Sequence, residues 1–159
     1  MDQKMDTTQL ETAAAAVIGQ IVILLSRLEF NLGLYLRNAV GGSDVDAVNP
    51  LIARLSFKSK LDALRDVVAH KFASDEQCRA EFLQWYAEMD NYRAKRNSFM
   101  HGRWAILPHV QQVVHVAPGL PNNKPQKELR YSLSSLREEL SAANRIVSLF
   151  GRWSAKWPL

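Results

Sequence analysis

Hydrophobic residues recur every three or four positions over most of this sequence, which is the spacing of one face of an α-helix. Gly41 and Gly42 end the first such segment, and Gly102 ends the third. Ser74 is the expected N-cap of the third segment, with Gln77 placed to complete a capping box. We predict helices over about residues 7–40, 51–72, 74–101 and 132–153, with a loop over residues 43–50.

The pattern changes between Arg103 and Tyr131. Two β-prone runs, 104–107 and 110–117, precede a loop rich in proline, glycine and asparagine, and 129–131 is placed to return as a strand. We therefore expect an all-α fold, an up-and-down bundle of about four main helices with a small β-hairpin or extended excursion between the third and the fourth. The whole chain, 1–159, is expected to form a single helical domain, with 103–131 as the excursion.

The composition narrows the class of protein. The chain has 159 residues, of which 47% are hydrophobic and 23% charged, a globular balance that argues against disorder or low complexity. Its formal net charge of +4 permits a polyanionic partner without requiring one. Cys78 is the only cysteine, which excludes an intrachain disulfide and a CxxC zinc site and favours a reducing compartment.

The longest uncharged apolar stretch is Thr12–Ser26. It is shorter than the roughly 20 residues that a membrane-spanning helix needs. The residues before it carry more negative than positive charge, and no cleavage pattern follows it, which argues against a signal peptide. We therefore expect a cytoplasmic protein with no membrane partner.

Two arginines interrupt the expected hydrophobic seam of the third helix. The seam positions follow spacings of 4, 3, 4, 3 and 4 residues and are Phe82, Tyr86, Met89, Arg93, Arg96 and Met100. Asn97 and His101 lie one and two turns beyond Arg93 on the same side. The last third of this helix is therefore expected to present a basic, hydrogen-bonding face.

The first helix contains a matching polar residue. Its expected seam consists of Ile18, Val22, Leu25, Glu29, Leu32 and Leu36. A carboxylate buried in such a seam needs a cationic or hydrogen-bonding partner. We therefore expect Glu29 to pair with Arg93 or Arg96. Such a pair could serve only to fix the register of the two helices.

An ion pair with Glu29 does not account for a second arginine, an asparagine and a histidine gathered at one helix end. Guanidinium groups bind phosphate through two hydrogen bonds, an asparagine can orient its neighbour, and histidine titrates near neutral pH. The cluster therefore indicates an anion site. It can lie within one chain or line a cleft at a dimer interface.

The segment Arg96-Asn97-Ser98-Phe99-Met100-His101-Gly102 resembles the R-x4-H motif of the HEPN superfamily. Two further segments are similar to the context of that motif, namely 28–32 in the first helix and 57–61 at the start of the second. The resemblance covers most of the chain and is weakest between residues 103 and 131. It implies an all-α domain that commonly dimerises, with two motifs meeting in a cleft.

Many proteins of this superfamily are metal-independent endoribonucleases in toxin–antitoxin or other defence systems, so the resemblance implies the same activity here. Arg96 and His101 would be the catalytic pair, and Asn97 the polar accessory residue. His101 would act as acid or base while Arg96 holds the scissile phosphate, and attack by the ribose 2′-OH would leave a 2′,3′-cyclic phosphate.

Three further cations near the motif are expected to bind substrate phosphates: Arg93, Lys95 and Arg103. The expected partners are RNA, a second copy of the chain and an antitoxin protein. No metal or other cofactor is expected, because His109 and His115, the nearest candidate pair of ligands, lack neighbouring carboxylates and suit an ordinary loop and strand.

Two other functions remain open at this point. Some HEPN-like proteins have lost catalysis, so the chain could be an RNA-binding or protein-interaction module. The arginines and Glu29 could also form a purely structural seam.

Overall fold

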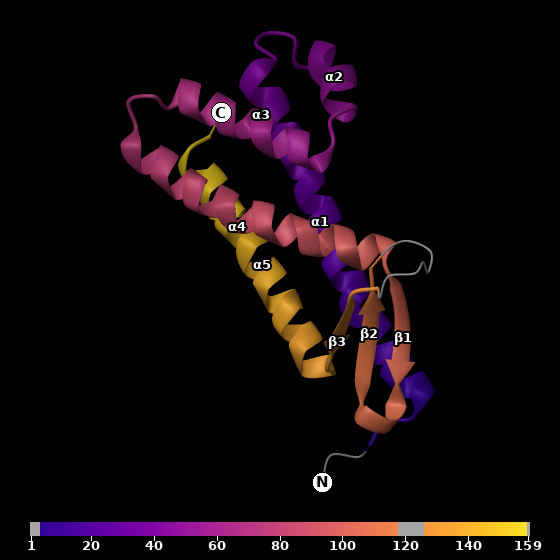
Figure 1. Cartoon of the computed structure of the whole chain (residues 1–159). Coiled ribbons are helices and arrows are strands. Elements are labelled where there is room, and N and C mark those ends of the chain that lie inside the picture. Colours follow the sequence, from indigo (N-terminus) through magenta and orange to yellow (C-terminus); the bar gives the residue numbers. More distant parts are fainter. Residues whose placement is uncertain (1–3, 118–125, 159) are drawn as a thin grey trace. The chain divides into compact units, whose positions relative to one another are not determined.

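The computed structural model describes residues 4–117 and 126–158. A mainly helical fold is confirmed for this part of the chain, with a small three-stranded antiparallel sheet between the last two helices (Figure 1). The elements in chain order are α1 (Thr7–Val40), η1 (Val45–Val48), α2 (Asn49–Ala53), α3 (Phe57–Lys71), α4 (Glu76–His101), β1 (Arg103–Leu107), η2 (Pro108–Val110), β2 (Gln112–Val116), β3 (Glu128–Tyr131) and α5 (Leu133–Lys156).

The chain forms two compact units. The first comprises Met1–Ile23 and Ala94–Ala143, and the second comprises Leu24–Arg93 and Asn144–Leu159. The sheet belongs to the first unit and α2 and α3 to the second, whereas α1, α4 and α5 contribute residues to both. Each unit has its own buried apolar side chains.

The long helices begin where a short polar side chain accepts a backbone hydrogen bond. Before α1, Asp6 Oδ1 accepts from Gln9 N at 2.8 Å and Gln9 Oε1 accepts from Asp6 N at 3.1 Å, which completes a capping box. Ser56 caps α3 through Ser59 N, and Ser132 begins α5 with the same kind of contact. These local contacts explain why helix positions were largely predictable.

The expected cap of the third predicted helix was wrong by one residue. Asp75 caps α4, because its Oδ1 accepts from Cys78 N at 2.8 Å. Gln77 does not complete a capping box with Ser74 but donates to Glu81 at 2.9 Å. A carboxylate at this position also interacts favourably with the positive end of the helix dipole, which a serine hydroxyl does not.

The helix predicted over 51–72 is two helices, α2 and α3. Ser56 separates them with an extended backbone (φ −64°, ψ 164°), since its hydroxyl caps α3. Pro50 lies in the first turn of α2, where its missing N–H costs no helical hydrogen bond. The loop predicted over 43–50 contains η1, which Asp44 caps through Ala47 N.

The expected hairpin is a sheet of order β1-β2-β3, in which both pairs of strands are antiparallel. Gln111 joins β1 to β2 in a left-handed conformation (φ 55°, ψ 43°). Its side chain also holds the chain before α1, because Nε2 donates to the Met5 carbonyl at 2.8 Å and Oε1 accepts from Met5 N at 2.9 Å. The expected proline- and asparagine-rich loop lies largely outside the described residues.

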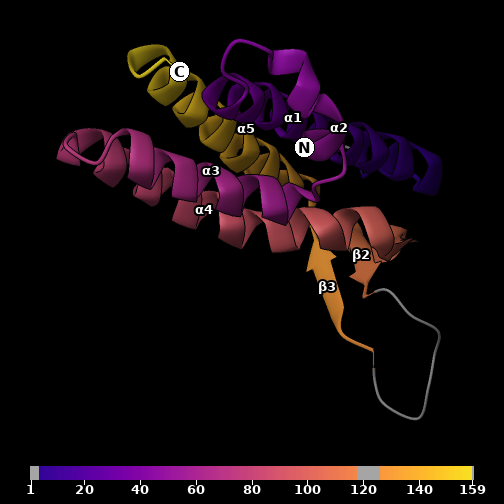
Figure 2. The ribbon, with the colours of Figure 1, turned by 90° about the horizontal axis from the view of Figure 1, so that it is seen from above.

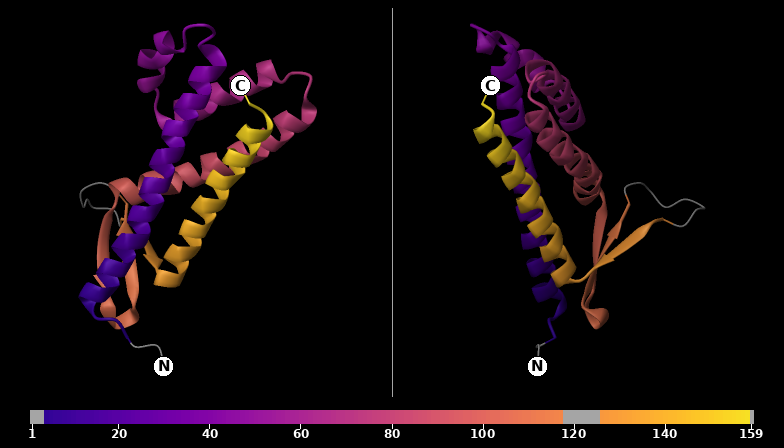
Figure 3. Two further views of the ribbon diagram at one scale, coloured as in Figure 1. Left: turned by 180° about the vertical axis from the view of Figure 1, so that it is seen from behind. Right: turned by 90° about the vertical axis from the view of Figure 1, so that its left-hand side faces the viewer.

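Aromatic side chains fill much of the second unit. Within this unit α5 lies beside α1 (Figure 3), and Tyr35 on α1 contacts Phe150 and Trp153 at ring separations of 5.7 and 5.4 Å. Trp85 Nε1 donates to the Ile146 carbonyl and Trp153 Nε1 donates to the Cys78 carbonyl, so both buried indole N–H groups are satisfied.

Helix α1 is apolar as well as long. An 18-residue window within it has a mean hydropathy of 1.7, and 28% of that window is buried, so α1 could cross a membrane by length and composition. Core helices of soluble proteins and signal sequences meet the same criterion. The finding therefore does not place the chain in a membrane.

Candidate functional site

The buried seam of α4 is rotated from the predicted one. Its buried side chains are Cys78, Phe82, Trp85, Met89, Tyr92 and Phe99. Tyr86, which was expected in the seam, is only half-buried, and Met100 is 44% exposed. Large aromatic side chains on the neighbouring positions remove more apolar surface from water, so they decide which face turns inward.

Arg96 falls on this observed seam, midway between Tyr92 and Phe99 in the helical repeat. The residue is half-buried, as is Asn97. Arg96 Nη1 donates to Asn97 Oδ1 at 3.0 Å. The asparagine therefore helps to orient the guanidinium, whose other N–H groups can point toward an anion.

His101 is the last residue of α4 and is exposed. It lies five positions after Arg96, which corresponds to about 140° around the helix axis. The helix register alone therefore does not turn the two side chains to one side. Within one chain, only the length of the Arg96 side chain could bring its guanidinium toward His101. Between two chains, a second copy could supply the His101 that faces Arg96.

The cations expected to bind substrate phosphates already have polar partners. In the first unit Lys95 Nζ lies 2.7 and 2.9 Å from the two carboxylate oxygens of Glu139, and the Arg103 guanidinium donates to Gln126 Oε1. In the second unit Arg93 Nε donates to Asp90 Oδ1 at 3.0 Å. A phosphate at Lys95 or Arg93 would have to compete with a carboxylate.

Glu29 lies at the edge of the buried seam of α1, and its expected pairing with Arg93 or Arg96 stays a prediction. The fully buried positions near it are Leu25, Leu28 and Leu32, whereas the side chain of Glu29 is 26% exposed. Its carboxylate lies 3.5 Å from Lys60 Nζ on α3. The seam follows the leucines because a carboxylate at its edge keeps part of its hydration.

His115, which the sequence placed on an ordinary strand, lies against the end of the helix that carries the motif. It lies on β2 with only 1% of its surface exposed, and its Nε2 is 2.8 Å from the Ser98 carbonyl near the end of α4. Its ring contacts Trp104 and Phe99 at centroid separations of 4.8 and 6.3 Å. Tyr131 joins the same aromatic cluster, and burial raises its pKa.

Gly102 owes its identity to His115. A Cβ added at Gly102 would lie 2.5 Å from His115 Cδ2 and 2.6 Å from Cε1, and closer still to Nε2. Its role is therefore to allow close approach. The only available sequence signal was the placement of a glycine directly after the motif histidine.

A second cluster of ionisable groups joins α3 to α4 within the second unit, where the two helices lie side by side (Figure 2). Tyr86 Oη donates to Asp62 and accepts from Lys58 Nζ at 2.8 Å. The hydrogen bond from Tyr86, followed by that from Lys58, holds the pKa of Asp62 below its usual range. Hydrogen bonds from Arg93 and then Lys58 lower the pKa of Asp90. This cluster links two helices.

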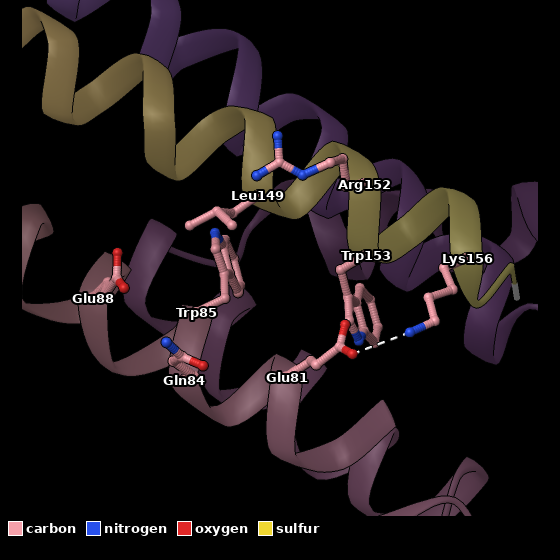
Figure 4. A pocket seen from close by; sticks show the side chains of 8 residues that line it. All are labelled: Glu81, Gln84, Trp85, Glu88, Leu149, Arg152, Trp153 and Lys156. Carbon is pink, nitrogen blue, oxygen red and sulfur yellow. Dashed lines mark hydrogen bonds and ion pairs between the residues drawn. The ribbon is translucent and has the colours of Figure 1, made fainter. Parts of the chain in front are cut away.

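A pocket of about 400 Å³ lies between α4 and α5 in the second unit (Figure 4). Trp85 and Trp153 line it, and Lys156 Nζ closes one end on Glu81 Oε1 at 3.0 Å. None of the motif residues lines it. Within residues 4–117 and 126–158, no three histidine, cysteine, aspartate or glutamate residues are grouped to hold a metal ion.

No family model, curated protein or solved structure matches this chain. The side chains of the candidate site are therefore the features that bear on its function.

Proposed function

We propose that this chain is a metal-independent endoribonuclease of HEPN type that acts in the cytoplasm as a toxin or a defence effector. The observation that carries the proposal is the placement of Arg96 and His101 near one helix end. Arg96 is half-buried and oriented by Asn97, whereas His101 is exposed to substrate. A fixed cation and a solvent-accessible imidazole, brought together in one cleft, are the groups that this metal-free phosphodiester cleavage requires.

In the proposed reaction the ribose 2′-OH attacks the adjacent phosphorus. A general base takes the 2′-OH proton, the bond from phosphorus to the 5′-oxygen breaks, and a general acid protonates that oxygen. The products are a 2′,3′-cyclic phosphate and a 5′-OH end. Arg96 neutralises the charge that develops on the phosphoryl oxygens, for which related electrostatic contacts contribute about 3 kcal/mol.

The proposal includes a homodimer, because two proton-transfer roles must be filled. Each motif offers one histidine, His101. A two-fold axis would bring a second copy into the same cleft, so that one His101 acts as base and the other as acid. It would also compensate for the separation of about 140° that the helix register leaves between Arg96 and His101.

The experiment that tests the proposal compares wild-type protein with His101→Ala on a generic RNA, with EDTA present. We expect wild type to cleave and to leave termini that resist phosphatase until acid opens the cyclic phosphate. His101→Ala should abolish cleavage and leave the melting temperature nearly unchanged, because the side chain is exposed.

The matched control is His70→Ala, which removes another exposed histidine from the last turn of a helix. This variant should cleave as wild type does. Equal cleavage by wild type and His101→Ala would end the catalytic assignment.

The second candidate function is a catalytically inactive module that binds RNA or protein. Two observations favour it, namely the carboxylate partners of Lys95 and Arg93 and the divergence of Arg96 from His101 around α4. RNA binding without cleavage at any concentration of wild-type protein would support this function. An antitoxin that neutralises the protein is expected as a partner only if the chain is an active toxin.

A further inference from the structure

The end of α4 is capped by side chains of the sheet. The last four carbonyls of a helix lack the N–H partners that a further turn would supply. In α4 two of them accept from the sheet: His115 Nε2 lies 2.8 Å from the Ser98 carbonyl, and Trp104 Nε1 donates to the Phe99 carbonyl at 3.2 Å. The Ser98 carbonyl also accepts the helical hydrogen bond from Gly102 N at 2.9 Å, so His115 supplies its second hydrogen bond.

The two capping side chains form one unit within the sheet. Trp104 on β1 and His115 on β2 are directly opposite each other, and their rings meet edge to face with centroids 4.8 Å apart. The carbonyl acceptor fixes the tautomer, because His115 Nε2 must carry the hydrogen. The Ser98 hydroxyl lies 3.4 Å from both His115 Nδ1 and His115 Nε2. The backbone and the side chain of Ser98 therefore both contact the imidazole ring.

Gly102 makes this arrangement possible. It occupies the position between His101 and β1, where a Cβ would collide with the imidazole ring. Because the ring is 1% exposed and contacts Phe99 and Trp104, it has no room to move away. The glycine and the histidine therefore fix the backbone on either side of His101.

We infer that His115, with Trp104 and Gly102, is a positioning residue that holds the last turn of α4 and thereby the orientation of His101. This inference rests on the proposed function for its effect on catalysis, because His101 is the proposed acid or base. A displacement of about 1 Å in a catalytic group can cost a hundredfold in rate. The cap therefore controls kcat without touching RNA.

The test uses His115→Leu, which keeps the bulk and removes the donor, and His115→Gln, which restores a side-chain N–H. We expect His115→Leu to lower kcat by on the order of tenfold to a hundredfold with little change in KM, and His115→Gln to recover part of the loss. Trp104→Phe provides a second variant, because it keeps a ring and deletes the donor to Phe99.

The matched control is Val113→Ala, which lies on the same strand and the same face and is also 1% exposed. It should lower stability by about 1–3 kcal/mol through lost packing and leave kcat unchanged. A merely structural role of His115 would make His115→Leu behave like Val113→Ala, and that result would overturn the inference.

A readout independent of cleavage separates this inference from the proposed function. Amide hydrogen exchange at Gly102 and the NMR signals of the His101 ring should change in His115→Leu and Trp104→Phe but not in Val113→Ala. If wild type cleaves no RNA but the Gly102 exchange rate and the His101 signals change in the two cap variants, the enzyme proposal is wrong and the positioning role of His115 is supported. Unchanged exchange and unchanged His101 signals in both cap variants would refute the cap even in an active enzyme. If His115→Leu does not fold, the Trp104→Phe result decides.

Discussion

At the scale of single residues, Cys78 shows how strongly packing controls ionisation in this protein. Its side chain is fully buried at the start of α4, among the aromatic side chains of the second unit. Burial, assisted by the negative charge of Asp75, raises the pKa of its thiol to about 11. Since the thiolate is the reactive form, this cysteine should be inert while the protein is folded.

We predict that native protein at pH 8 reacts with iodoacetamide far more slowly than the same protein in denaturant, where burial is lost and the pKa returns toward its ordinary value. Mass spectrometry over a time course measures the labelled fraction. Rapid labelling of the native protein would show that Cys78 is accessible and that the start of α4 opens readily.

Two contacts near the motif differ in how far apart their residues lie in the sequence. Arg96 and Asn97 are neighbours, whereas His115 and Ser98 are 17 positions apart. The motif string therefore indicated Arg96, Asn97 and His101, but it could not indicate the residue that holds their helix end.

At the scale of elements, the caps determine where helices begin. Asp75 and Ser74 offer a direct comparison, because both can cap a helix and only Asp75 bonds to the first turn of α4.

We predict that Asp75→Ala lowers the free energy of unfolding by about 1 kcal/mol, whereas Ser74→Ala changes it by less than about half of that. Urea unfolding followed by tryptophan fluorescence measures both values. A larger loss in Ser74→Ala than in Asp75→Ala would return the cap to Ser74. The hydrogen bond from Trp157 Nε1 to Asp75 Oδ2 adds to the expected loss.

The α3–α4 pair makes the second unit sensitive to acid. The pKa values of Asp62 and Asp90 are lowered by their hydrogen bonds with Tyr86 and Arg93 respectively. Because both carboxyls bind protons more weakly in the folded state, the ionised forms stabilise folding above the unfolded pKa of about 3.9. That contribution is lost as the pH falls through the lower, folded-state values.

We predict that the urea midpoint falls as the pH is lowered from about 5 to about 3, and that Asp90→Asn falls less steeply than wild type over the same range. Circular dichroism at a series of pH values measures the midpoints. Parallel curves for the two proteins would show that Asp90 gains nothing from its ionised form in the folded state.

At the scale of the whole molecule, the proposed activity depends on a second copy of the chain. Because the proposed cleft needs one His101 as base and the other as acid, a dimer with a single His101→Ala chain should be inactive.

We predict that wild type refolded with an equal amount of His101→Ala retains about a quarter of the cleavage of the same total amount of wild type, because only the quarter of dimers that contain two wild-type chains keep both histidines. A sedimentation measurement confirms that the mixture is dimeric. About half of wild-type cleavage in a mixture shown to be dimeric would mean that each chain cleaves with its own His101.

The sequence by itself determined the helical segments, the change to strands near Arg103 and the candidate motif. These features depend on spacing and caps within a few residues, such as Gly41 and Gly42 at the end of α1 and Ser132 at the start of α5. Because these signals are local, they left some helix ends uncertain. Ser74 and Asp75 can both cap a helix, and Ser56 fits a helical position within residues 51–72 as well as it fits a cap.

Tertiary structure alone decided which face of each helix turned inward and which partners its polar residues found. Trp85, Tyr92 and Phe99 set the buried seam of α4, and the carboxylate of Glu29 lies 3.5 Å from Lys60 Nζ. His115, on strand β2, contacts the end of α4. These outcomes depend on packing among residues that are far apart in the chain. The shapes of the packed side chains, and not their spacing in the sequence, decide which surface is buried and which hydrogen bonds form.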